Sequence, residues 1–406
     1  MARLGLLFAI LTAASAIAAH KGADYHFSGN DAINHIADTN VPFPNLPGGW
    51  YASEQCVSGY CVYANPSASG GAGIAVITTA SSVEKLKAME WRLGGPDTSG
   101  IPDPPPYEVR DIPGRGKILV ATEPIKRGTK LLSNEPVMVV QRGFLNETFA
   151  EKREALLKIA VKLLPAETQK RIYAQLDPAN GIPALKDVVE RRPFEVNLGL
   201  VWVGEDGYEG EKHLVNFPDA ATLPHHCRPN AAFHVDGNLV QHVSAARKIQ
   251  PGEEISISYF NPFLSTPDRQ ANTEKWFGKA CTCDACTKGG DLDQILASDA
   301  RLQEIRTIES RLRDFGSKIT TGTLARLVEL YQEENLESRM AEMYGQVAIG
   351  YNSLGYQKRA IKYANLAVQA CIIQDGPGSN DVAAMRILAK STTDHYSWRM
   401  RVKDRK

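Results

Sequence analysis

The sequence predicts an α+β protein in which a β-rich region is followed by an all-helical region. Three observations lead to this prediction. Between residues 107 and 260, short β-branched runs alternate with turns that contain Gly and Pro. After Gly290, apolar residues recur three or four positions apart over long runs. Between the two regions lies Cys281-x-Cys283-x-x-Cys286, a spacing that is typical of thiolate ligands to a metal.

The length and charge of the chain restrict its classes of partner. A chain of 406 residues is long enough for two or three domains with sizeable cores. Its 46 basic and 46 acidic residues balance, so no overall field attracts nucleic acid or an acidic membrane. We therefore expect no direct nucleic-acid binding, and we expect any basic partner to be recognised locally. The sequence does not indicate the oligomeric state.

Residues 1–19 have the pattern of a cleavable secretory signal. Arg3 precedes an apolar run from Leu4 to Ala14, which is followed by small residues around Ala18. The run is too short to span a bilayer, and nothing else in the sequence approaches a transmembrane segment. The alternative is an apolar first helix that is retained. The expected location is the secretory pathway or the exterior if the signal acts, and the nucleus or cytoplasm if it does not.

Residues 20–106 are rich in Gly, Pro and Ser, and they form a predicted lead-in that packs on the next domain. One strand is expected at 73–79 and one helix at 82–91. A stiff Pro-rich linker ends the region at residue 106. Cys56 and Cys61 are spaced so that an oxidising compartment could close a small disulfide loop.

The region 107–260 is predicted to form sheets that are interrupted by a helical insert at about residues 145–190. Apolar residues three or four positions apart indicate the helices of the insert. The expected strands, which are bounded by turn residues, are Tyr107–Asp111, Lys117–Ala121, Lys130–Leu132, Pro136–Val140, Phe194–Val203, Lys212–Phe217, Leu239–Ser244 and Ile255–Tyr259.

The region 290–406 consists of long amphipathic runs, which predict an all-helical domain. Met340–Tyr351 followed by Ala360–Ala370 resembles a tetratricopeptide-type helical pair. Cys371 lies within an apolar helical pattern and is expected in the core. Such an array would pack on the β-rich domain, either as a structural cap or as one wall of a peptide groove.

The cysteine trio is one thiol short of a tetrahedral zinc site, and Cys227 could supply the fourth. This residue lies within Pro224-His225-His226-Cys227-Arg228-Pro229-Asn230. A structural zinc is bound with a free energy on the order of 10 kcal/mol. We therefore expect the ion to clamp the trio onto the loop that carries Cys227, with Tyr259 close by.

Four motifs occur in one order in this chain, and together they resemble the SET-domain protein lysine methyltransferases. The motifs are Gly114-Arg115-Gly116, His225-x-Cys227-x-Pro229-Asn230, Gly252-Glu253-Glu254 with Tyr259 five residues on, and the cysteine trio. The resemblance covers about residues 107–286. With its helical tail, the layout is most similar to fungal SMYD-like proteins that lack the MYND finger.

The resemblance implies a fold, an activity and a set of site residues. It implies a SET domain with a pseudoknot, a zinc-binding post-SET loop at 261–289, and transfer of a methyl group from S-adenosylmethionine to a lysine of a protein or peptide. Tyr259 is the implied catalytic residue, and a structural Zn2+ is held by Cys227, Cys281, Cys283 and Cys286. The implied cofactor contacts are Arg115, Gly116, Lys117, His225 and Phe277, with Trp276 as an alternative to Phe277 for stacking on adenine.

Two positions depart from the family pattern. Pro224 replaces an Asn that grips the cofactor, and Lys279 replaces an aromatic residue before the trio. His226 has no family role, and a surface or zinc-edge position is expected for it. These departures support an alternative function, in which a catalytically weak or inactive SET-fold protein acts as a protein-binding module. A third hypothesis is a secreted, disulfide-stapled interaction protein that binds no zinc.

Overall fold

The structure is a computed structural model that describes residues 45–46, 49–89, 98–176, 184–190, 194–202 and 208–402. The predicted signal at residues 1–19 lies outside the described residues and stays a prediction. None of the described helices combines the length and apolarity needed to cross a membrane.

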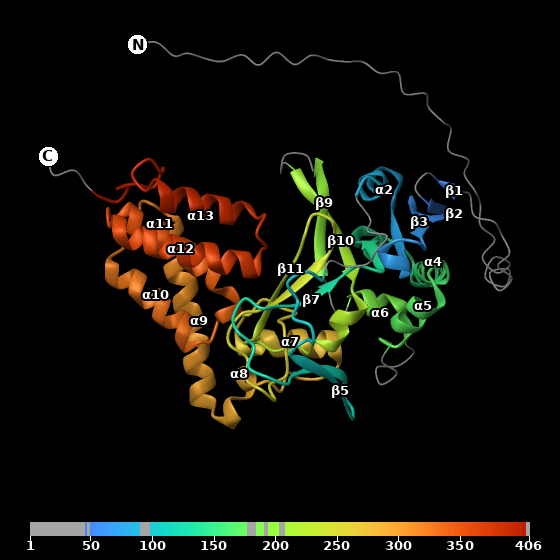
Figure 1. Cartoon of the computed structure of the whole chain (residues 1–406), viewed down its shortest axis with the longest axis horizontal. Coiled ribbons are helices and arrows are strands. Elements are labelled where there is room, and N and C mark those ends of the chain that lie inside the picture. The colour runs from blue at the N-terminus through green and yellow to red at the C-terminus, as the bar shows by residue number, and fades with distance from the viewer. Residues whose placement is uncertain are drawn as a thin grey trace, which may run out of the picture. The chain divides into compact units, whose positions relative to one another are not determined.

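The largest sheet has seven strands in the order β1-β2-β3-β4-β8-β10-β9. All neighbours in it are antiparallel except β4 and β8, which are parallel. Its strands are β1 (Asn45–Leu46), β2 (Trp50–Val57), β3 (Tyr60–Asn65), β4 (Ile74–Thr79), β8 (Met138–Gln141), β10 (Tyr208–Asn216) and β9 (Phe194–Trp202). Residues 45–79 therefore share one sheet with strands from the region 107–260, as Figure 1 shows.

The sequence predicted β4 but not β2 or β3. A register shift between Ala52 and Cys56 interrupts the alternation of β2, so its pattern does not repeat every second residue. Cys56 and Cys61 face each other across β2 and β3 and form a disulfide. Residues from both halves of the sheet, such as Trp50 and Val215, belong to the same buried core.

Two smaller sheets carry the segments around the candidate site. One has the order β11-β12-β7 and the other pairs β5 with β6. Their strands are β5 (Tyr107–Ile112), β6 (Gly116–Ala121), β7 (Lys130–Asn134), β11 (Ala231–Val235) and β12 (Gln241–Ala245).

The strand predicted at Ile255–Tyr259 is wrong. This segment makes only isolated bridges, from Glu254 to Val120 and from Ile257 to His225. Its backbone bonds go to several separate segments: Ile255 N–H donates to the carbonyl of Leu119, and Ser256 N–H donates to Asn230 Oδ1 at 2.9 Å. Backbone polar groups that are satisfied by scattered partners in this way need no single strand partner.

The helical insert contains α3 (Arg142–Glu147), α4 (Ala150–Lys162), α5 (Ala166–Tyr173) and α6 (Leu185–Glu190). Helix α4 packs against β2, β3 and β4. Helix α2 (Ala80–Lys87) follows β4 and begins two residues earlier than expected, with Thr79 in an extended conformation at the N-cap position.

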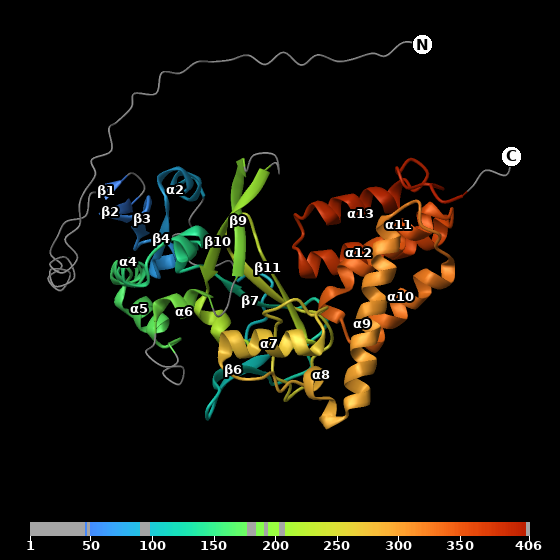
Figure 2. The same cartoon turned by 180° about the vertical axis from the view of Figure 1, so that it is seen from behind.

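The remaining helices are α7 (Thr266–Phe277), α8 (Asp284–Thr287), α9 (Leu292–Arg313), α10 (Thr321–Glu333), α11 (Met340–Ser353), α12 (Gln357–Gln374) and α13 (Asn380–Lys390). Figures 1 and 2 show α9 to α13 gathered into one helical group, with α8 beside α9. This group has its own buried core, which includes Cys371. Helices α11 and α12 pack together as the sequence predicts, whereas their tetratricopeptide-type character stays a prediction.

The α10–α11 contact depends on the absence of a side chain at Gly350. A Cβ built at Gly350 would lie 2.5 Å from Cδ2 of Leu324, which is fully buried. At Gly345, in the same helix, a Cβ would meet only Met385 Sδ, at 3.8 Å.

We predict opposite effects of alanine at these two glycines. Gly345→Ala should stabilise the protein by about 0.5–1 kcal/mol, because alanine restricts the unfolded chain and favours helix. Gly350→Ala should gain the same stabilisation from the restricted unfolded chain, but overpacking against Leu324 should cost about 1–3 kcal/mol of stability. Urea unfolding of both variants measures the difference, and equal stability of the two would contradict the packing described for α10 and α11.

Candidate functional site

Four cysteines from two distant parts of the chain meet in one cluster. The Sγ atoms of Cys227, Cys281, Cys283 and Cys286 all lie within 4.8 Å of one another. Cys227 Sγ lies 4.0 Å from Cys281 Sγ and 3.5 Å from Cys286 Sγ. The structure therefore brings together the thiols that the spacing singled out.

The geometry and chemistry of this cluster fit a zinc ion. Zn–S bonds of about 2.3 Å in a tetrahedron place the sulfurs roughly 3.8 Å apart, close to the two distances given above. Hydrogen bonds from Cys227, then Cys281 and Cys286, hold the pKa of Cys283 well below its ordinary value. A thiolate is the form that binds metal.

Arg269, on α7, places a buried positive charge beside the thiols. Burial disfavours its charge, but a hydrogen bond to Cys286 and the charge of Cys227 raise its pKa above the ordinary value. Its Nη2 donates to the carbonyl of Ala285 at 3.2 Å, and its Nε has no nitrogen or oxygen partner in the structure as described. A guanidinium in this position offsets the negative charge of a tetrathiolate site.

His225 connects this cluster to Tyr259. Its Nε2 lies 3.4 Å from Cys227 Sγ, and its Nδ1 accepts from the backbone N–H of Tyr259 at 3.1 Å. Burial lowers the pKa of His225 to about 4, so the ring is neutral at physiological pH. A neutral ring has one proton, which these contacts place on Nε2.

The backbone of His225 remains available for a ligand. His226 N–H donates to the carbonyl of Ile257, and Ile257 N–H donates to the carbonyl of Pro224. In this parallel bridge the N–H and carbonyl of His225 itself point to the opposite side. Neither has a hydrogen-bond partner among the described residues.

Tyr259 is held at both ends. Its hydroxyl donates to the carbonyl of Leu223. Its ring centroid lies 5.5 Å from that of His225 and 5.7 Å from that of Phe277. Phe260 completes this aromatic group, 6.0 Å from Phe277. The phenol oxygen therefore keeps its accepting capacity while the ring is fixed.

A cavity of about 1300 Å3 collects these residues. Among the residues that line it are Arg115, Pro224, His225, Tyr259, Phe277 and Lys279, and also Asn335 and Glu337 from the helical region. Of the predicted cofactor contacts, Arg115, His225 and Phe277 face this cavity, whereas Gly116 and Lys117 are not among its lining residues. Phe277 lines it and Trp276 does not, which separates the two aromatic candidates.

The glycine turn before β6 has a conformational role in the structure. Gly116 has φ +76°, and a Cβ added there would meet nothing within 4 Å. The left-handed backbone, rather than crowding, therefore favours glycine. Arg115 is already engaged by Glu254 through two contacts of 2.7 and 2.6 Å.

Four residues that hold the segments around this cavity were assigned no role from the sequence, although one of them, Asn230, belongs to the loop motif. Asn230 and Arg228 lie within the loop motif, and their polar side chains beside Cys227 were an available signal. Arg269 and Glu334 lie in helical runs, where a charged residue ordinarily faces solvent. No local pattern distinguishes these two from their exposed neighbours.

Comparisons with known proteins agree with this geometry. Residues 116–260 match the SET domain model. The N-lysine methyltransferase SMYD2 of Gallus gallus is 37% identical over 162 residues, covering 37% of this chain and 36% of that protein. The human N-lysine methyltransferase SMYD2 is 37% identical over 71 residues, covering 18% of this chain and 16% of that protein. A SET and MYND domain-containing protein of Dictyostelium discoideum is 36% identical over 64 residues, covering 16% of this chain and 19% of that protein.

Residues 116–260 thus match a SET domain, and the chain is similar, at modest identity, to SMYD2 lysine methyltransferases. It spans about a third or less of the length of the curated relatives that it matches. The match to the SET model ends at residue 260, before the cysteine trio and helices α7 to α13.

We predict that the purified chain contains one zinc ion and that Cys227→Ser removes it. Loss of a thiolate weakens a tetrahedral site whose binding energy is on the order of 10 kcal/mol. Cys371→Ala is the matched control, because Cys371 is also buried but lies in the helical core. Metal analysis after gel filtration measures the content, and zinc retained by Cys227→Ser would exclude Cys227 as a ligand.

Proposed function

We propose that this chain transfers a methyl group from S-adenosylmethionine to the amine of a lysine in a protein substrate. The observation that carries the proposal is one cavity, lined in part by the region that matches the SET domain, where a fixed tyrosine and a loop with free backbone groups meet. The names of the relatives support lysine as the acceptor.

The residues that would hold the cofactor follow from the cavity lining. The free N–H and carbonyl of His225 offer one donor and one acceptor. The ring of Phe277 offers an aromatic face, and Arg115 lines the cavity next to the glycine turn. Pro224 has no side-chain amide to add, but its carbonyl still accepts from Ile257 N–H at 3.1 Å, so the loop keeps its place. When bound, this cofactor supplies a methyl group attached to a positively charged sulfur.

The chain's own part is to prepare and orient the lysine amine. The amine must lose a proton and its water before its lone pair can form a bond to carbon. The rings of Tyr259 and Phe277, which line the cavity, provide an apolar surrounding, and such a surrounding lowers the pKa of a lysine ammonium. The phenol oxygen of Tyr259 donates to Leu223 and can accept an N–H from the amine. No strong general base is required by this arrangement.

The tetrathiolate cluster would act through structure. We propose that a zinc ion there fixes the Cys281–Cys286 stretch against the loop that carries His225, and so closes the cavity beside Phe277. The ion would make no contact with the substrate, since four thiolates complete its tetrahedron.

We predict that Tyr259→Phe reduces turnover about a hundredfold and leaves cofactor affinity unchanged. A positioned hydrogen-bonding group commonly contributes about this much to an enzymatic rate. Tyr107→Phe is the matched control, because its hydroxyl also donates to a backbone carbonyl, that of Leu131, at 2.9 Å, and Tyr107 does not line the cavity.

Two measurements test the proposal and this prediction together. Calorimetry with S-adenosylmethionine should show micromolar binding, and labelled cofactor should transfer its methyl group to a protein in a panel of peptides and lysates. Absence of binding at millimolar cofactor would refute the proposal and leave the protein-binding alternative. Equal turnover of Tyr259→Phe and Tyr107→Phe would refute the role of the phenol.

A further inference from the structure

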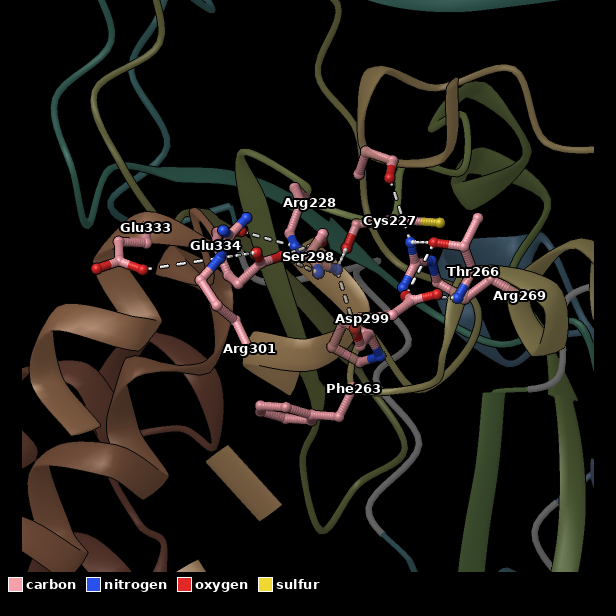
Figure 3. A network of polar contacts seen from close by, with 12 residues as sticks. Cys227, Arg228, Phe263, Thr266, Arg269, Ser298, Asp299, Arg301, Glu333 and Glu334 are labelled. Atoms are coloured by element: carbon pink, nitrogen blue, oxygen red, sulfur yellow. Dashed lines mark hydrogen bonds and ion pairs between the residues drawn. The ribbon is translucent and has the colours of Figure 1, made fainter. Parts of the chain in front are cut away.

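Arg228 is a buried cation that joins the loop of the site to the helical region (Figure 3). Its Nη2 lies 2.8 Å from Oε2 of Glu334, and its Nε donates to the backbone carbonyl of Glu334 at 2.6 Å. Glu334 is the C-cap residue of α10. Arg228 therefore satisfies a carbonyl at a helix C-terminus, where a positive charge is also favoured by the helix dipole.

Glu334 is fixed by further partners on α9. Its Oε2 accepts from the hydroxyl of Ser298 at 2.7 Å, and its Oε1 accepts from Nε of Arg301 at 2.7 Å. The Glu334 side chain has no solvent exposure. Buried charges are tolerated when they are paired and fully hydrogen-bonded, and this carboxylate has three donors from side chains. The acceptor for Arg228 is thus held rigidly by two helices.

Arg228 also donates hydrogen bonds to two segments that flank Tyr259 in space. Its Nη1 donates to the carbonyl of Cys227 and to the carbonyl of Pro262, each at 2.9 Å. Cys227 belongs to the loop that receives the N–H of Tyr259 through His225. Pro262 follows Tyr259 by three residues. The Arg228 guanidinium therefore fixes both the loop that bonds to Tyr259 and the chain three residues after Tyr259.

We propose that Arg228 and Glu334 are positioning residues, through which α9 and α10 hold His225 and Tyr259 in the geometry needed for methyl transfer. This inference rests on the proposed function. Neither residue has to touch the reacting atoms. Asn335 and Glu337, one and three residues after Glu334, line the cavity, so a shift at the end of α10 would also move a cavity wall.

The first variants are Glu334→Gln and Arg228→Lys. Glu334→Gln keeps the shape of the side chain and removes its negative charge. Arg228→Lys keeps the positive charge but removes the planar guanidinium, whose several N–H groups reach different carbonyls. We expect kcat to fall about 10- to 100-fold in both, because small misplacement of a catalytic group has effects of this size. The KM for cofactor should change by less than about threefold.

Glu333→Gln is the matched control. Glu333 is the neighbouring carboxylate, its side chain is 44% exposed, and it pairs with Arg326 at 2.9 Å. Its contact with Arg301, at 3.7 Å, is much longer than the 2.7 Å between Arg301 and Glu334, so its charge contributes little to holding Glu334. We expect wild-type kcat and KM for this variant. A kcat in Glu334→Gln equal to that of Glu333→Gln would overturn the proposal.

A double variant separates positioning from stability. Arg228→Met with Glu334→Met removes both buried charges, and such replacements often leave stability unchanged or raise it. We expect a folded protein whose melting temperature is close to that of the wild type but whose kcat stays low, because the bonds to Cys227 and Pro262 are lost. Full recovery of kcat in this variant would show that the pair serves stability alone, and would overturn the proposal.

A second readout does not depend on methyl transfer. Since Arg228 braces the Cys227 carbonyl, loosening it should speed the release of zinc from the zinc-loaded protein to a chromogenic chelator. We expect about a tenfold faster release in Glu334→Gln than in Glu333→Gln. If the wild type neither binds S-adenosylmethionine nor transfers a methyl group, the proposed function fails. Independently of that result, equal rates of zinc release from Glu334→Gln and Glu333→Gln would refute the positioning role.

Discussion

The loop His225–Asn230 is the constraint on which the rest of the site depends. Its side chains bond in turn to different parts of the molecule: His225 to Tyr259, Cys227 to the cysteine trio, Arg228 to α10 and Asn230 to the segment at 254–256. An irregular loop in the interior cannot satisfy its polar groups through a regular ladder. Here side chains supply part of the bonding, and each side-chain bond fixes a different segment around one cavity.

Two buried arginines beside this loop, Arg228 and Arg269, have different kinds of partner. Arg228 meets a carboxylate and three carbonyls, whereas Arg269 faces thiols and backbone carbonyls. Removal of either charge would leave its partners unpaired at low dielectric, which is costlier than the mean strength of a hydrogen bond suggests. The bonds of these two buried arginines therefore stabilise the surroundings of the loop, in addition to its packing.

The departures from the family pattern have a limited structural effect. Pro224 keeps the backbone carbonyl bond to Ile257 that holds the loop, so the loss is confined to a side-chain amide and a backbone N–H. At the other position, Lys279 lines the cavity while Phe277, two residues earlier, lies beside Tyr259. The cavity thus keeps an aromatic wall, although the residue comes from the last turn of α7 rather than from the position next to the cysteines.

The sequence by itself determined the elements whose signals are local. The strand at β6, the helices after Gly290 and the grouping of Cys227 with the trio all followed from periodicity, turn residues and ligand spacing. Tertiary structure alone decided that Ile255–Tyr259 is not a strand, because its backbone bonds are divided among several separate segments and the side chain of Asn230 instead of being made to one neighbouring strand. It also decided the pairing of Arg228 with Glu334, which are 106 residues apart. Such contacts arise when distant segments fold against each other, and no period or spacing along the chain encodes them.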